Sequence, residues 1–499
     1  MTTLWQKAGA KKIAAMLKDK NIVVVGLGLT GLSCVRFLQS HHITFAVNDS
    51  RSNPLNEHAL AEFTERYPQV TLVLGRWDAQ LISQADILLV SPGVDLATPI
   101  FQHKKPSCQL WGDVELYCRL TDTPILAVTG SNGKSTVVSL LAHLGQSLGM
   151  NAQLGGNIGV PVLDHLTTED NHLEKISNKS KLNKSDLDKN KLIECLILEL
   201  SSFQLESLTS MNAIAATVLN VSDDHLDRHL TMHNYQTIKL GIYQQCETAV
   251  INRDEAALTQ AISDFSLNNA NNISFGSDSA EIGHFGIDKF ATDKGDERAF
   301  LMFGQQPLIA VDLLPIAGLH NALNCLAALA LGYAAGWSLS GMVDNLTTFV
   351  GLPHRCQKIA SDDEAIWIND SKATNVGATL AAINGLSQTM QPQQKLILIA
   401  GGEGKGADFS PLQVAINTHV DQLITLGKDG DKIAKLSKTA INVNNLDEAV
   451  LTANKLVKSY KDQSYVLLSP ACASIDMFPN YMVRGQAFVD AVHQLKEAS

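Results

Sequence analysis

Several features that would place this chain in a common class are missing from its sequence. None of its eight cysteines belongs to a C-x-x-C pair, which argues against a zinc ribbon or a disulfide framework and fits a reducing compartment. No run reaches the roughly eighteen uninterrupted apolar residues of a membrane-spanning helix. The N-terminal segment contains lysines but lacks the apolar core and cleavage site of a secretory signal. We therefore expect a cytoplasmic protein that does not insert into a membrane.

Positive charge is also scarce. The chain has 39 Lys and Arg against 50 Asp and Glu, a net charge of -11. A nucleic-acid-binding protein needs a concentrated basic surface, so nucleic acid is not expected as a partner. An acidic protein that binds anionic nucleotides must concentrate positive potential locally, at glycine-rich turns, helix N-termini and a few Lys or Arg side chains.

Short apolar segments are what the sequence has in abundance. Hydrophobic residues make up 45% of the 499 residues, and this length suggests about three domains. The segments are rich in Val, Ile and Leu and alternate with helix-like stretches, which predicts an α/β fold with parallel sheets and crossover helices. In such sheets ligands bind beyond the carboxyl ends of the strands. The predicted strands are residues 21–26, 85–90, 124–128, 195–199, 215–219, 395–400 and 465–468.

Two polar stretches interrupt this pattern. Residues 167–192 are rich in Asn, Lys, Asp and Ser, which predicts a mobile surface insertion because they can bury little apolar area. Residues 268–298 are also polar, but residues 273–275 and 284–287 are compatible with short strands.

A first glycine-rich motif follows the first predicted strand. Gly26, Gly28 and Gly31 form G-x-G-x-x-G at the start of a predicted helix, and Asp49 lies about twenty residues further on. The motif indicates a diphosphate at the helix N-terminus but does not identify the base. Alone, it fits either a dinucleotide-dependent dehydrogenase or a tight strand-to-helix turn without a ligand.

A second phosphate-binding motif follows residues 124–128. The segment from Gly130 to Thr136 reads G-S-N-G-K-S-T, a shortened P-loop in which Val128 stands where a full Walker motif has its first glycine. Backbone N–H groups can surround phosphates, Lys134 can neutralise them, and the Ser135 hydroxyl can reach Mg²⁺. The strand before it and the apolar helix after it argue against a merely solvated loop. Two phosphate loops suggest two nucleotide ligands.

Acidic, His and Lys side chains follow two further apolar segments. Glu199 ends the strand predicted at residues 195–199, where it fits either a Mg²⁺ ligand or an exposed strand-end carboxylate. Asp224 and His225 follow the strand at residues 215–219, and Lys239 comes later. On their own, the last three are more typical of a solvated loop and a surface lysine.

Together these motifs resemble the Mur ligase family. The resemblance extends over roughly residues 21–488 apart from the insertion, with the motifs in the family's order. The shared motifs are Gly130 to Thr136, Gly156 to Gly159, the Glu199 segment, Asp224-His225 and Gly318 to Asn324.

Three later blocks resemble the branch of that family that adds D-glutamate. They are Gly351 to Arg355, Asn369 to Asn375, and Leu468 to Phe478 with Tyr481 and Arg484-Gly485. Sibling ligases and folylpolyglutamate synthase have a His-bearing segment where this chain has Asp370 to Asn375. The nearest alternative functions are therefore another Mur ligase or folylpolyglutamate synthase.

The resemblance implies an ATP-dependent amide ligase with three domains. Residues 1–112 would form a Rossmann-like UDP-binding domain, residues 113–350 a central P-loop-type ATPase domain containing the insertion, and residues 351–499 a Rossmann-like domain that binds the amino acid. The implied substrates are UDP-N-acetylmuramoyl-L-alanine and D-glutamate, and the implied cofactors are ATP and two Mg²⁺ ions. A monomer is expected.

The resemblance also assigns the nucleotide sites. The UDP substrate would contact Leu29, Thr30, Ser50, Arg51, Gly93 and Asn157. ATP would contact Gly130, Ser131, Asn132, Gly133, Lys134, Ser135, Thr136, Asn321, Asn324 and Arg355, with Asp370 on its ribose.

The catalytic residues implied by the resemblance are Lys134, Glu199, His225 and Lys239. The metal ligands would be Ser135, Glu199, His225 and Lys239, the last as a CO₂-derived carbamate. D-Glutamate would contact Lys372, Thr374, Lys405, Ser474 and Tyr481. The family often has Phe at the position of Tyr481, and Glu403 stands where a close variant has Asp. A non-catalytic nucleotide-binding regulator is a further alternative, but such a sensor would not need Lys134, Glu199, His225 and Lys239 together.

Overall fold

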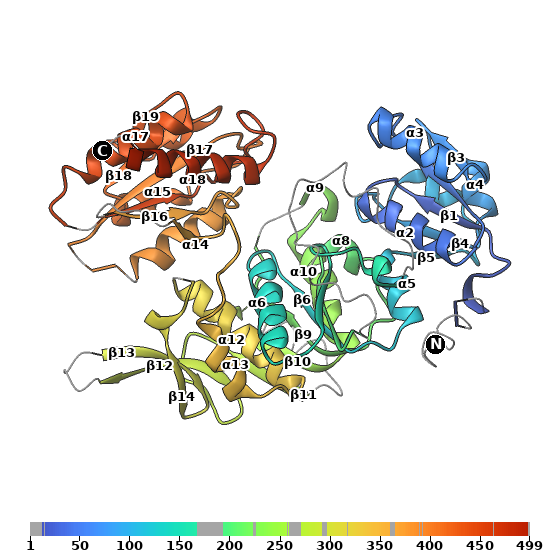
Figure 1. Cartoon of the computed structure of the whole chain (residues 1–499), viewed down its shortest axis with the longest axis horizontal. Helices are drawn as coiled ribbons and strands as arrows, with labels where there is room; N and C mark the ends of the chain where they lie inside the picture. Colours follow the sequence, from blue (N-terminus) through green and yellow to red (C-terminus); the bar gives the residue numbers. More distant parts are fainter. Residues whose placement is uncertain are drawn as a thin grey trace. The chain divides into compact units, whose positions relative to one another are not determined.

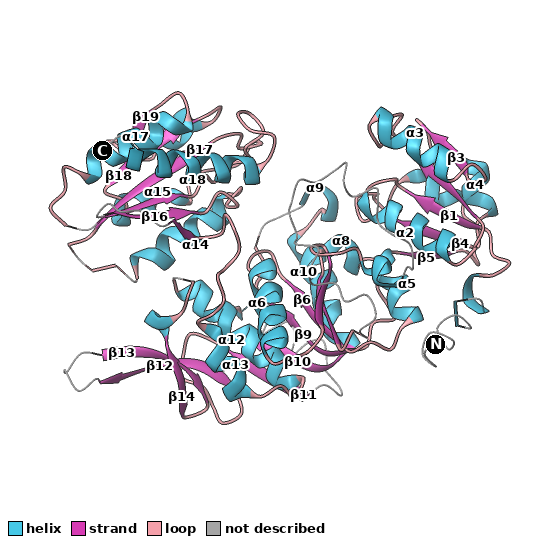
Figure 2. Cartoon of the chain, viewed as in Figure 1, coloured by secondary structure: helices cyan, strands magenta, loops and turns pink. Residues whose placement is uncertain are grey.

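The chain is described here from a computed structural model. It describes residues 12–497 except 14, 167–192, 223–225, 257, 259–270, 292–296, 317, 360–364, 389, 392 and 463. The predicted insertion and the predicted site residues Asp224 and His225 therefore lie outside the described residues. The described part forms three parallel or mostly parallel sheets and a separate antiparallel sheet (Figures 1 and 2).

The first sheet is fully parallel, with the strand order β3-β2-β1-β4-β5. All four residues of β1 are buried, as expected for an apolar strand covered on both faces. Figure 2 shows helices beside the strands of this sheet. Its elements are β1 (Ile22–Val25), α2 (Leu29–Ser40), β2 (Phe45–Asp49), α3 (Glu57–Arg66), β3 (Thr71–Leu74), α4 (Ala79–Gln84), β4 (Ile87–Val90), η1 (Pro99–His103) and β5 (Gln109–Trp111).

The second sheet is also parallel where its pairing is known, with the strand order β11-β10-β9-β6-β8-β7. Every residue of β6 and β8 is buried, which agrees with their places inside the sheet. Its strands are β6 (Ile125–Thr129), β7 (Ala152–Gly156), β8 (Cys195–Glu199), β9 (Ala213–Val218), β10 (Cys246–Asn252) and β11 (Asn271–Phe275). Its helices are α5 (Asp113–Leu120), α6 (Lys134–Ser147), η2 (Val162–Leu166), α8 (Ser202–Leu205), α9 (Leu226–His229), α10 (Met232–Leu240) and η3 (Gly241–Gln245).

An antiparallel sheet follows, in the order β12-β13-β14. Aromatic side chains support it: the rings of Phe285 and Phe303, which face each other across β12 and β13, lie 4.8 Å apart. The elements of this region are β12 (Phe285–Ala291), β13 (Glu297–Phe303), β14 (Gln306–Ala310), η4 (Val311–Leu313), α12 (Leu319–Ala334) and α13 (Leu339–Leu346).

The last sheet has the order β15-β16-β20-β17-β18-β19, in which only β15 is antiparallel to its neighbour. Separate apolar clusters, one containing Trp367 and Phe488 and the other Leu398 and Phe409, form its core. Its strands are β15 (Gln357–Ile359), β16 (Ala365–Asn369), β17 (Lys395–Gly401), β18 (Gln422–Leu426), β19 (Ile441–Asn442) and β20 (Ser464–Leu468). Its helices are α14 (Val376–Ser387), α15 (Leu412–His419), α16 (Gly430–Ala434), α17 (Leu446–Val457) and α18 (Tyr481–Glu497).

Contacts divide the chain into two compact units. Unit 1 comprises residues 1–274 and 331–337, and unit 2 comprises residues 275–330 and 338–499. The first two sheets lie in unit 1 apart from one end residue of β11, and the last two lie in unit 2. The residue boundaries of the three domains stay a prediction.

The predicted fold class is confirmed, because all seven predicted strands coincide with strands of parallel sheets to within a few residues. The short strands suspected at residues 273–275 and 284–287 correspond to β11 and β12. The antiparallel sheet and the antiparallel edge strand β15 were not predicted. None of the helices in the described ranges combines the length and apolar character needed to cross a membrane.

Candidate active site

The glycine-rich turn after β1 meets the loop after β4. A Cβ atom on Gly31 would lie 2.0 Å from the Gly26 carbonyl oxygen, so only glycine permits this tight entry into α2. The Ser91 hydroxyl donates a 2.9 Å hydrogen bond to the same carbonyl. The strand order reverses between β1 and β4, the position at which open α/β sheets form a ligand crevice. This arrangement brings three predicted site residues to the same end of the sheet: Leu29 and Thr30 at the start of α2, and Gly93 in the loop after β4.

Asp49 and Arg51 lie at the end of β2, next to the glycine-rich turn. The Asp49 carboxylate accepts hydrogen bonds from the Leu27 N–H at 2.7 Å and from the Arg51 side chain at 2.7 and 3.0 Å. Burial works to raise the pKa of Asp49, but these hydrogen bonds outweigh it and lower the pKa. The carboxylate is therefore engaged within the protein, while the Arg51 side chain remains 57% exposed beside the exposed Ser50.

The P-loop connects β6 to α6. Gly130 and Gly133 both have positive φ, 150° and 83°, and the first turn of α6 contains Lys134, Ser135 and Thr136. The Lys134 ammonium donates to the carbonyl oxygens of Gly130 at 2.6 Å and Ser131 at 3.0 Å. The loop thus places a cation and the N-terminus of a 14-residue helix together, as phosphate binding requires.

Residues that follow β9 and a side chain of α10 hold this loop in place. The Asn220 side chain accepts from the Asn132 N–H at 2.7 Å and donates to its carbonyl oxygen at 3.2 Å. The Ser131 hydroxyl lies 3.2 Å from the Tyr235 hydroxyl and accepts from the Ser222 N–H at 2.9 Å. No role was predicted for Asn220 or Tyr235, although Asn220 directly follows an apolar strand, which was an available signal.

Glu199 ends β8 between the ends of β6 and β7. It pairs with Val128 on one side and Gly156 on the other, and the Asn157 side chain donates a 2.7 Å hydrogen bond to its Oε1. Glu199 is 2% exposed, and its Oε2 has no hydrogen-bond partner among the residues that the structure describes. A buried carboxylate oxygen without a partner is costly unless a cation binds it, so this position fits a metal ion.

Lys239 on α10 is buried beside the P-loop and is 1% exposed. Its ammonium lies 3.3 Å from the Thr129 hydroxyl, 3.1 Å from the Gly130 carbonyl oxygen and 4.6 Å from the centre of the Tyr235 ring. Judged from its place in the sequence alone, Lys239 was predicted to lie on the surface. That prediction is wrong, because α10 packs this side chain against the end of β6. Among described residues, no group of three or more His, Cys, Asp or Glu side chains is arranged to hold a metal.

The predicted ATP residues of unit 2 lie on α12 and near the end of β16. Asn321 and Asn324 are one turn apart and buried, and the Asn324 side chain donates to the Asn321 side chain at 3.2 Å. The Asp370 carboxylate accepts from the Cys356 N–H at 3.3 Å and the Ser469 hydroxyl at 2.9 Å. Burial raises the pKa of Asp370 to about 7. Arg355 precedes Cys356 in the same turn.

Lys372 and Tyr481 are brought together although they are far apart in the sequence. The Lys372 ammonium lies 4.4 Å from the centre of the Tyr481 ring. Ser371 connects their backbones, because its hydroxyl donates to the Tyr481 carbonyl oxygen at 2.8 Å. Thr374 follows in the same loop, where its N–H donates to the Lys372 carbonyl oxygen at 2.7 Å.

Ser474 and Lys405 belong to two loops that pair with each other. Glu403 and Ala473 exchange two backbone hydrogen bonds of 2.9 Å, which places the loop after β17 beside the loop after β20. Ser474 is buried, whereas Lys405 is exposed and has a φ of 50°. Both loops leave the same edge of the sheet as the Lys372 loop, since β16, β20 and β17 are parallel neighbours.

Comparison with known proteins identifies the family. Three family models match in succession: a Mur ligase MurD-like N-terminal domain at residues 20–108, a Mur ligase middle domain at 128–332 and a Mur ligase glutamate ligase domain at 354–472. The UDP-N-acetylmuramoylalanine--D-glutamate ligase of Colwellia psychrerythraea is 53% identical over 97% of this chain and 98% of its own. The chain belongs to the Mur ligase family. The ligase of the same name from Hahella chejuensis is 39% identical over 97% of this chain and 100% of its own.

Solved structures of Mur ligases share this three-domain fold. The UDP-N-acetylmuramate-alanine ligase of Thermotoga maritima covers 96% of this chain and 100% of its own, with a TM-score of 0.55 and 15% identity. The MurF ligase of Thermotoga maritima, solved in complex with ADP, covers 83% of this chain and 90% of its own, with a TM-score of 0.54 and 16% identity.

This Mur ligase also contains a buried guanidinium for which no role was predicted. Arg484 on α18 is 3% exposed and donates to the Ser371 hydroxyl at 3.0 Å and to the carbonyl oxygens of Ser371 and Cys472 at 2.8 and 3.1 Å. Burial lowers its pKa to about 10. Arg484 thus holds the Lys372 loop against the Ser474 loop, a connection between distant segments that its place in the sequence does not reveal.

Proposed function

We propose that this Mur ligase uses ATP to join D-glutamate to UDP-N-acetylmuramoyl-L-alanine during synthesis of the peptidoglycan precursor. The observation that carries the proposal is the 53% identity, over 97% of the chain, to a UDP-N-acetylmuramoylalanine--D-glutamate ligase. Neither a dehydrogenase nor a non-catalytic regulator is proposed. The P-loop, the buried Glu199 and the buried Lys239 all lie near the end of β6, and neither of those functions would need them together.

The chemistry requires that the substrate carboxylate be activated, because a carboxylate does not acylate an amine at neutral pH. Its oxygen attacks the γ-phosphorus of ATP and displaces ADP, which gives an acyl phosphate. The amine of D-glutamate then attacks the acyl carbon, and the tetrahedral intermediate expels phosphate as the amide forms. The first step brings anions together, so positive groups must screen their repulsion.

The P-loop is proposed to provide that screening in unit 1. N–H groups from Gly130 to Thr136 would bind ATP phosphates, with Lys134 turning from the loop carbonyls to the phosphates. Asn220 and Tyr235 would keep the loop in its binding conformation before ATP arrives, so that little ordering entropy is lost on binding. In unit 2, Asn321, Asn324 and Arg355 are proposed to contact ATP, and Asp370 its ribose.

The buried Glu199 carboxylate supports a proposed Mg²⁺ site. We propose that Glu199, the Ser135 hydroxyl, His225 and a carbamate on Lys239 hold two ions. Glu199 Oε2, which has no hydrogen-bond partner within the described ranges, supports one of them. When bound, Mg²⁺ would neutralise phosphate charge during the attack. Asn157 fixes Glu199 by its 2.7 Å hydrogen bond and is also proposed to contact the UDP substrate. A carbamate would turn the cationic Lys239 into an anionic ligand.

The two remaining substrates have separate proposed sites. The UDP group would bind at the β1/β4 crevice, where Leu29, Thr30, Ser50, Arg51 and Gly93 surround the glycine-rich turn. The second site, in unit 2, would bind D-glutamate: its carboxylates would pair with Lys372 and Lys405 and accept hydrogen bonds from Thr374 and Ser474, with the Tyr481 ring against the lysine.

The test is ATP-dependent phosphate release with UDP-N-acetylmuramoyl-L-alanine, measured in parallel with D-glutamate, L-glutamate, L-alanine and meso-diaminopimelate. We expect release with D-glutamate alone and a product heavier by one glutamyl residue. Release with another amino acid would keep the ligase chemistry and overturn the proposed acceptor. If all four fail, a folate substrate with L-glutamate would test the folylpolyglutamate synthase alternative. A cytoplasmic monomer stays a prediction.

A further inference from the structure

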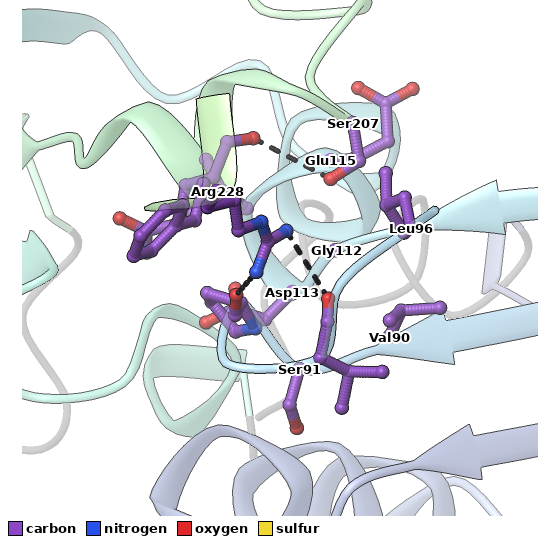
Figure 3. A pocket seen from close by; sticks show the side chains of 13 residues that line it. Val90, Ser91, Leu96, Gly112, Asp113, Glu115, Ser207 and Arg228 are labelled. Carbon is purple, nitrogen blue, oxygen red and sulfur yellow. Dashed lines mark hydrogen bonds between the residues drawn. The ribbon is translucent and has the colours of Figure 1, made fainter. Parts of the chain in front are cut away.

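A partly buried arginine links the first two sheets within unit 1. Arg228 on α9 lines a small pocket with residues of the β4 loop, which we define as residues 91–96 after β4, and with Phe203 and Ser207 of the α8 region. Its side chain is 11% exposed. Figure 3 shows the Arg228 side chain directed toward the β4 loop, with Ser91 and Leu96 on that loop.

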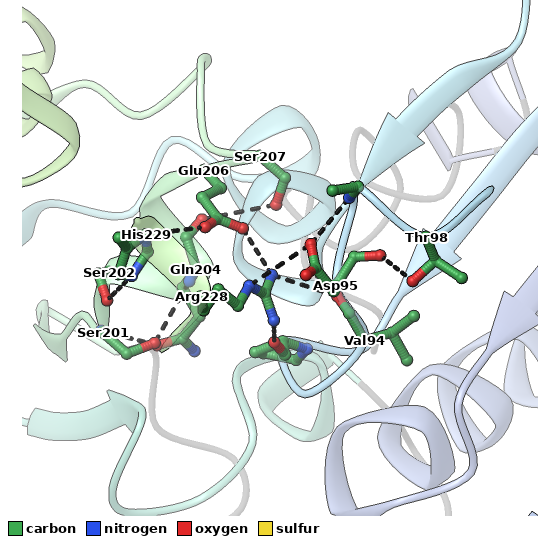
Figure 4. Close-up of polar contacts among 12 residues, drawn as sticks. Val94, Asp95, Thr98, Ser201, Ser202, Gln204, Glu206, Ser207, Arg228 and His229 are labelled. Carbon is green, nitrogen blue, oxygen red and sulfur yellow. Dashed lines mark hydrogen bonds and ion pairs between the residues drawn. The ribbon is translucent and has the colours of Figure 1, made fainter. Parts of the chain in front are cut away.

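The guanidinium of Arg228 is bonded to both ends of the segment that carries Gly93. Its Nη1 donates to the Pro92 carbonyl oxygen at 3.1 Å, and its Nη2 donates to the Val94 carbonyl oxygen at 3.3 Å. Its Nε lies 3.8 Å from the Asp95 carboxylate (Figure 4). A planar guanidinium reaches two carbonyl oxygens from two nitrogens held at a fixed spacing, whereas a lysine would have to reach both from one nitrogen atom.

Arg228 is also fixed to the helical segment that follows Glu199, in part through the same Nη2 that donates to Val94. Its Nη2 lies 2.6 Å from the Glu206 carboxylate, and its Cζ lies 4.5 Å from the centre of the Phe203 ring. A capping box between Ser201 and Gln204 fixes the start of this short helix, α8. The same Glu206 lies 3.4 Å from the His229 ring, which contacts the Ser202 hydroxyl at 2.9 Å (Figure 4).

These contacts connect two places that the proposed reaction uses. On one side, the β4 loop reaches the glycine-rich turn through the bond from Ser91 to Gly26. On the other side, α8 begins three residues after Glu199. Arg228 therefore sets the position of the β4 loop relative to the strand that carries Glu199, and it does so with bonds that are largely shielded from water.

We propose that Arg228 is a positioning residue for the UDP-linked substrate: it holds the β4 loop in the conformation that binds the nucleotide, anchored on Glu206 and Phe203. This inference rests on the proposed function only in taking the β1/β4 crevice as the UDP site. Arg228 acts through the Pro92 and Val94 carbonyl groups and has no role in phosphoryl transfer.

The test is Arg228→Ala and Arg228→Lys in the full chain, compared by steady-state kinetics and by calorimetric titration with UDP. Arg228→Ala frees both loop carbonyls, so we expect the KM for UDP-N-acetylmuramoyl-L-alanine and the Kd for UDP to rise about tenfold or more, the loss of one to two good hydrogen bonds. The KM for ATP is expected to stay within about twofold. Arg228→Lys keeps the charge but not the paired donors, so its KM for the UDP substrate and its Kd for UDP should lie between those of wild type and Arg228→Ala.

Arg119 provides a matched control. It also pairs with a glutamate, Glu115 at 2.6 Å, and lies 4.7 Å from an aromatic ring centre, that of Trp111, in the same unit. Its guanidinium lies against these two side chains rather than against the β4 loop. Arg119→Ala should lower thermal stability much as Arg228→Ala does, yet leave the UDP affinity and both KM values unchanged.

The outcomes separate this inference from the proposed function. An active wild-type enzyme whose Arg228→Ala variant keeps its KM for the UDP substrate and its Kd for UDP would overturn the inference alone. Equal losses of UDP and ATP affinity, or the same loss in Arg119→Ala, would also overturn it, since a general loss of stability would then suffice. A wild-type protein that binds UDP but ligates none of the tested amino acids would overturn the function, while the UDP titrations would still decide the role of Arg228.

Discussion

Single residues show where this molecule departs from ordinary packing. Glu199 has a buried carboxylate oxygen for which the described part of the chain offers no partner, Lys239 has a buried ammonium, and Asp370 has a buried carboxyl group near the end of β16. Burial of ionisable groups costs free energy that apolar residues at the same places would not cost. Their burial near strand ends is consistent with the ligand-binding roles proposed for them.

Lys372 is expected to bind a D-glutamate carboxylate. Lys372→Ala should raise the KM for D-glutamate by about tenfold or more while changing the KM for ATP little, because a charge-assisted hydrogen bond is worth about 1.5–3 kcal/mol. Steady-state kinetics with D-glutamate as the varied substrate measures this effect. Lys395→Ala, which removes a lysine paired with Asp421 elsewhere in the same sheet, is the control. Unchanged D-glutamate saturation in Lys372→Ala would remove this lysine from the site.

Lys239 is expected to act as a carbamate. Lys239→Ala should lose activity, and high bicarbonate should not restore it because no amine remains to react with CO₂. Lys239→Arg keeps the positive charge beside Thr129 and Gly130 but cannot supply the same anionic ligand, so it should be equally inactive. Phosphate-release assays of both variants measure this. Near-normal turnover in either one would contradict the carbamate.

Asp370 should make stability depend on pH. Burial raises its pKa from 3.8 to about 7, so the folded protein favours the protonated carboxyl. The stability that Asp370 contributes is present in full below about pH 4 and is lost as the pH rises to about 7. Asp370→Asn should therefore become more stable relative to wild type as the pH rises across this window. The ratio of the two unfolding equilibrium constants should change by up to roughly tenfold per pH unit. Urea unfolding of both proteins at pH 5, 6, 7 and 8 measures the difference, and parallel pH profiles would contradict it.

At the scale of elements, glycines control how closely the strand edges approach. Gly156 ends β7 with a φ of 92°, and a Cβ atom there would lie 2.2 Å from the Glu199 carbonyl oxygen. The backbone N–H of Asn157 donates to that same oxygen at 2.8 Å. The ends of β7 and β8 are therefore in register only if residue 156 has no side chain.

Gly156→Ala should displace Asn157 and Glu199 together and lower turnover by more than about tenfold, since displacements of about 1 Å in a site can cost that much. Gly149→Ala is the matched control: its φ is 85°, but a Cβ atom there would contact nothing within 4 Å. It should lose about 1 kcal/mol of stability from the left-handed backbone and keep its turnover. Phosphate release and thermal unfolding of both variants measure this, and equal turnover would contradict the expectation.

At the scale of the whole molecule, the chain consists of α/β sheets whose loops carry the proposed sites, together with one polar segment, residues 167–192, outside the described residues. Its composition predicts that it contributes little to the core. Replacing residues 167–192 by a short Gly-Ser linker should leave turnover within about twofold of wild type. Phosphate release and the unfolding midpoint measure this. Loss of folding or activity, with recovery in a Gly-Ser segment of the original length, would show that spacing matters rather than sequence.

The sequence by itself determined the parallel sheets and the loops that carry the motifs. Both are local properties: runs such as residues 195–199 are apolar because both faces of the strand are covered, and glycines such as Gly133 mark turns with positive φ. The resemblance to a family then supplied roles for Lys134, Glu199 and Lys372 that spacing alone left open.

Only the tertiary structure decided which loops meet. The strand order places Asn220 on Asn132, 88 residues away, and Arg228 on Pro92, 136 residues away. Lys239 reads as a surface lysine in the sequence but is buried by the packing of α10 on the end of β6. Such contacts depend on the order and register of distant strands, which no local pattern of side chains encodes.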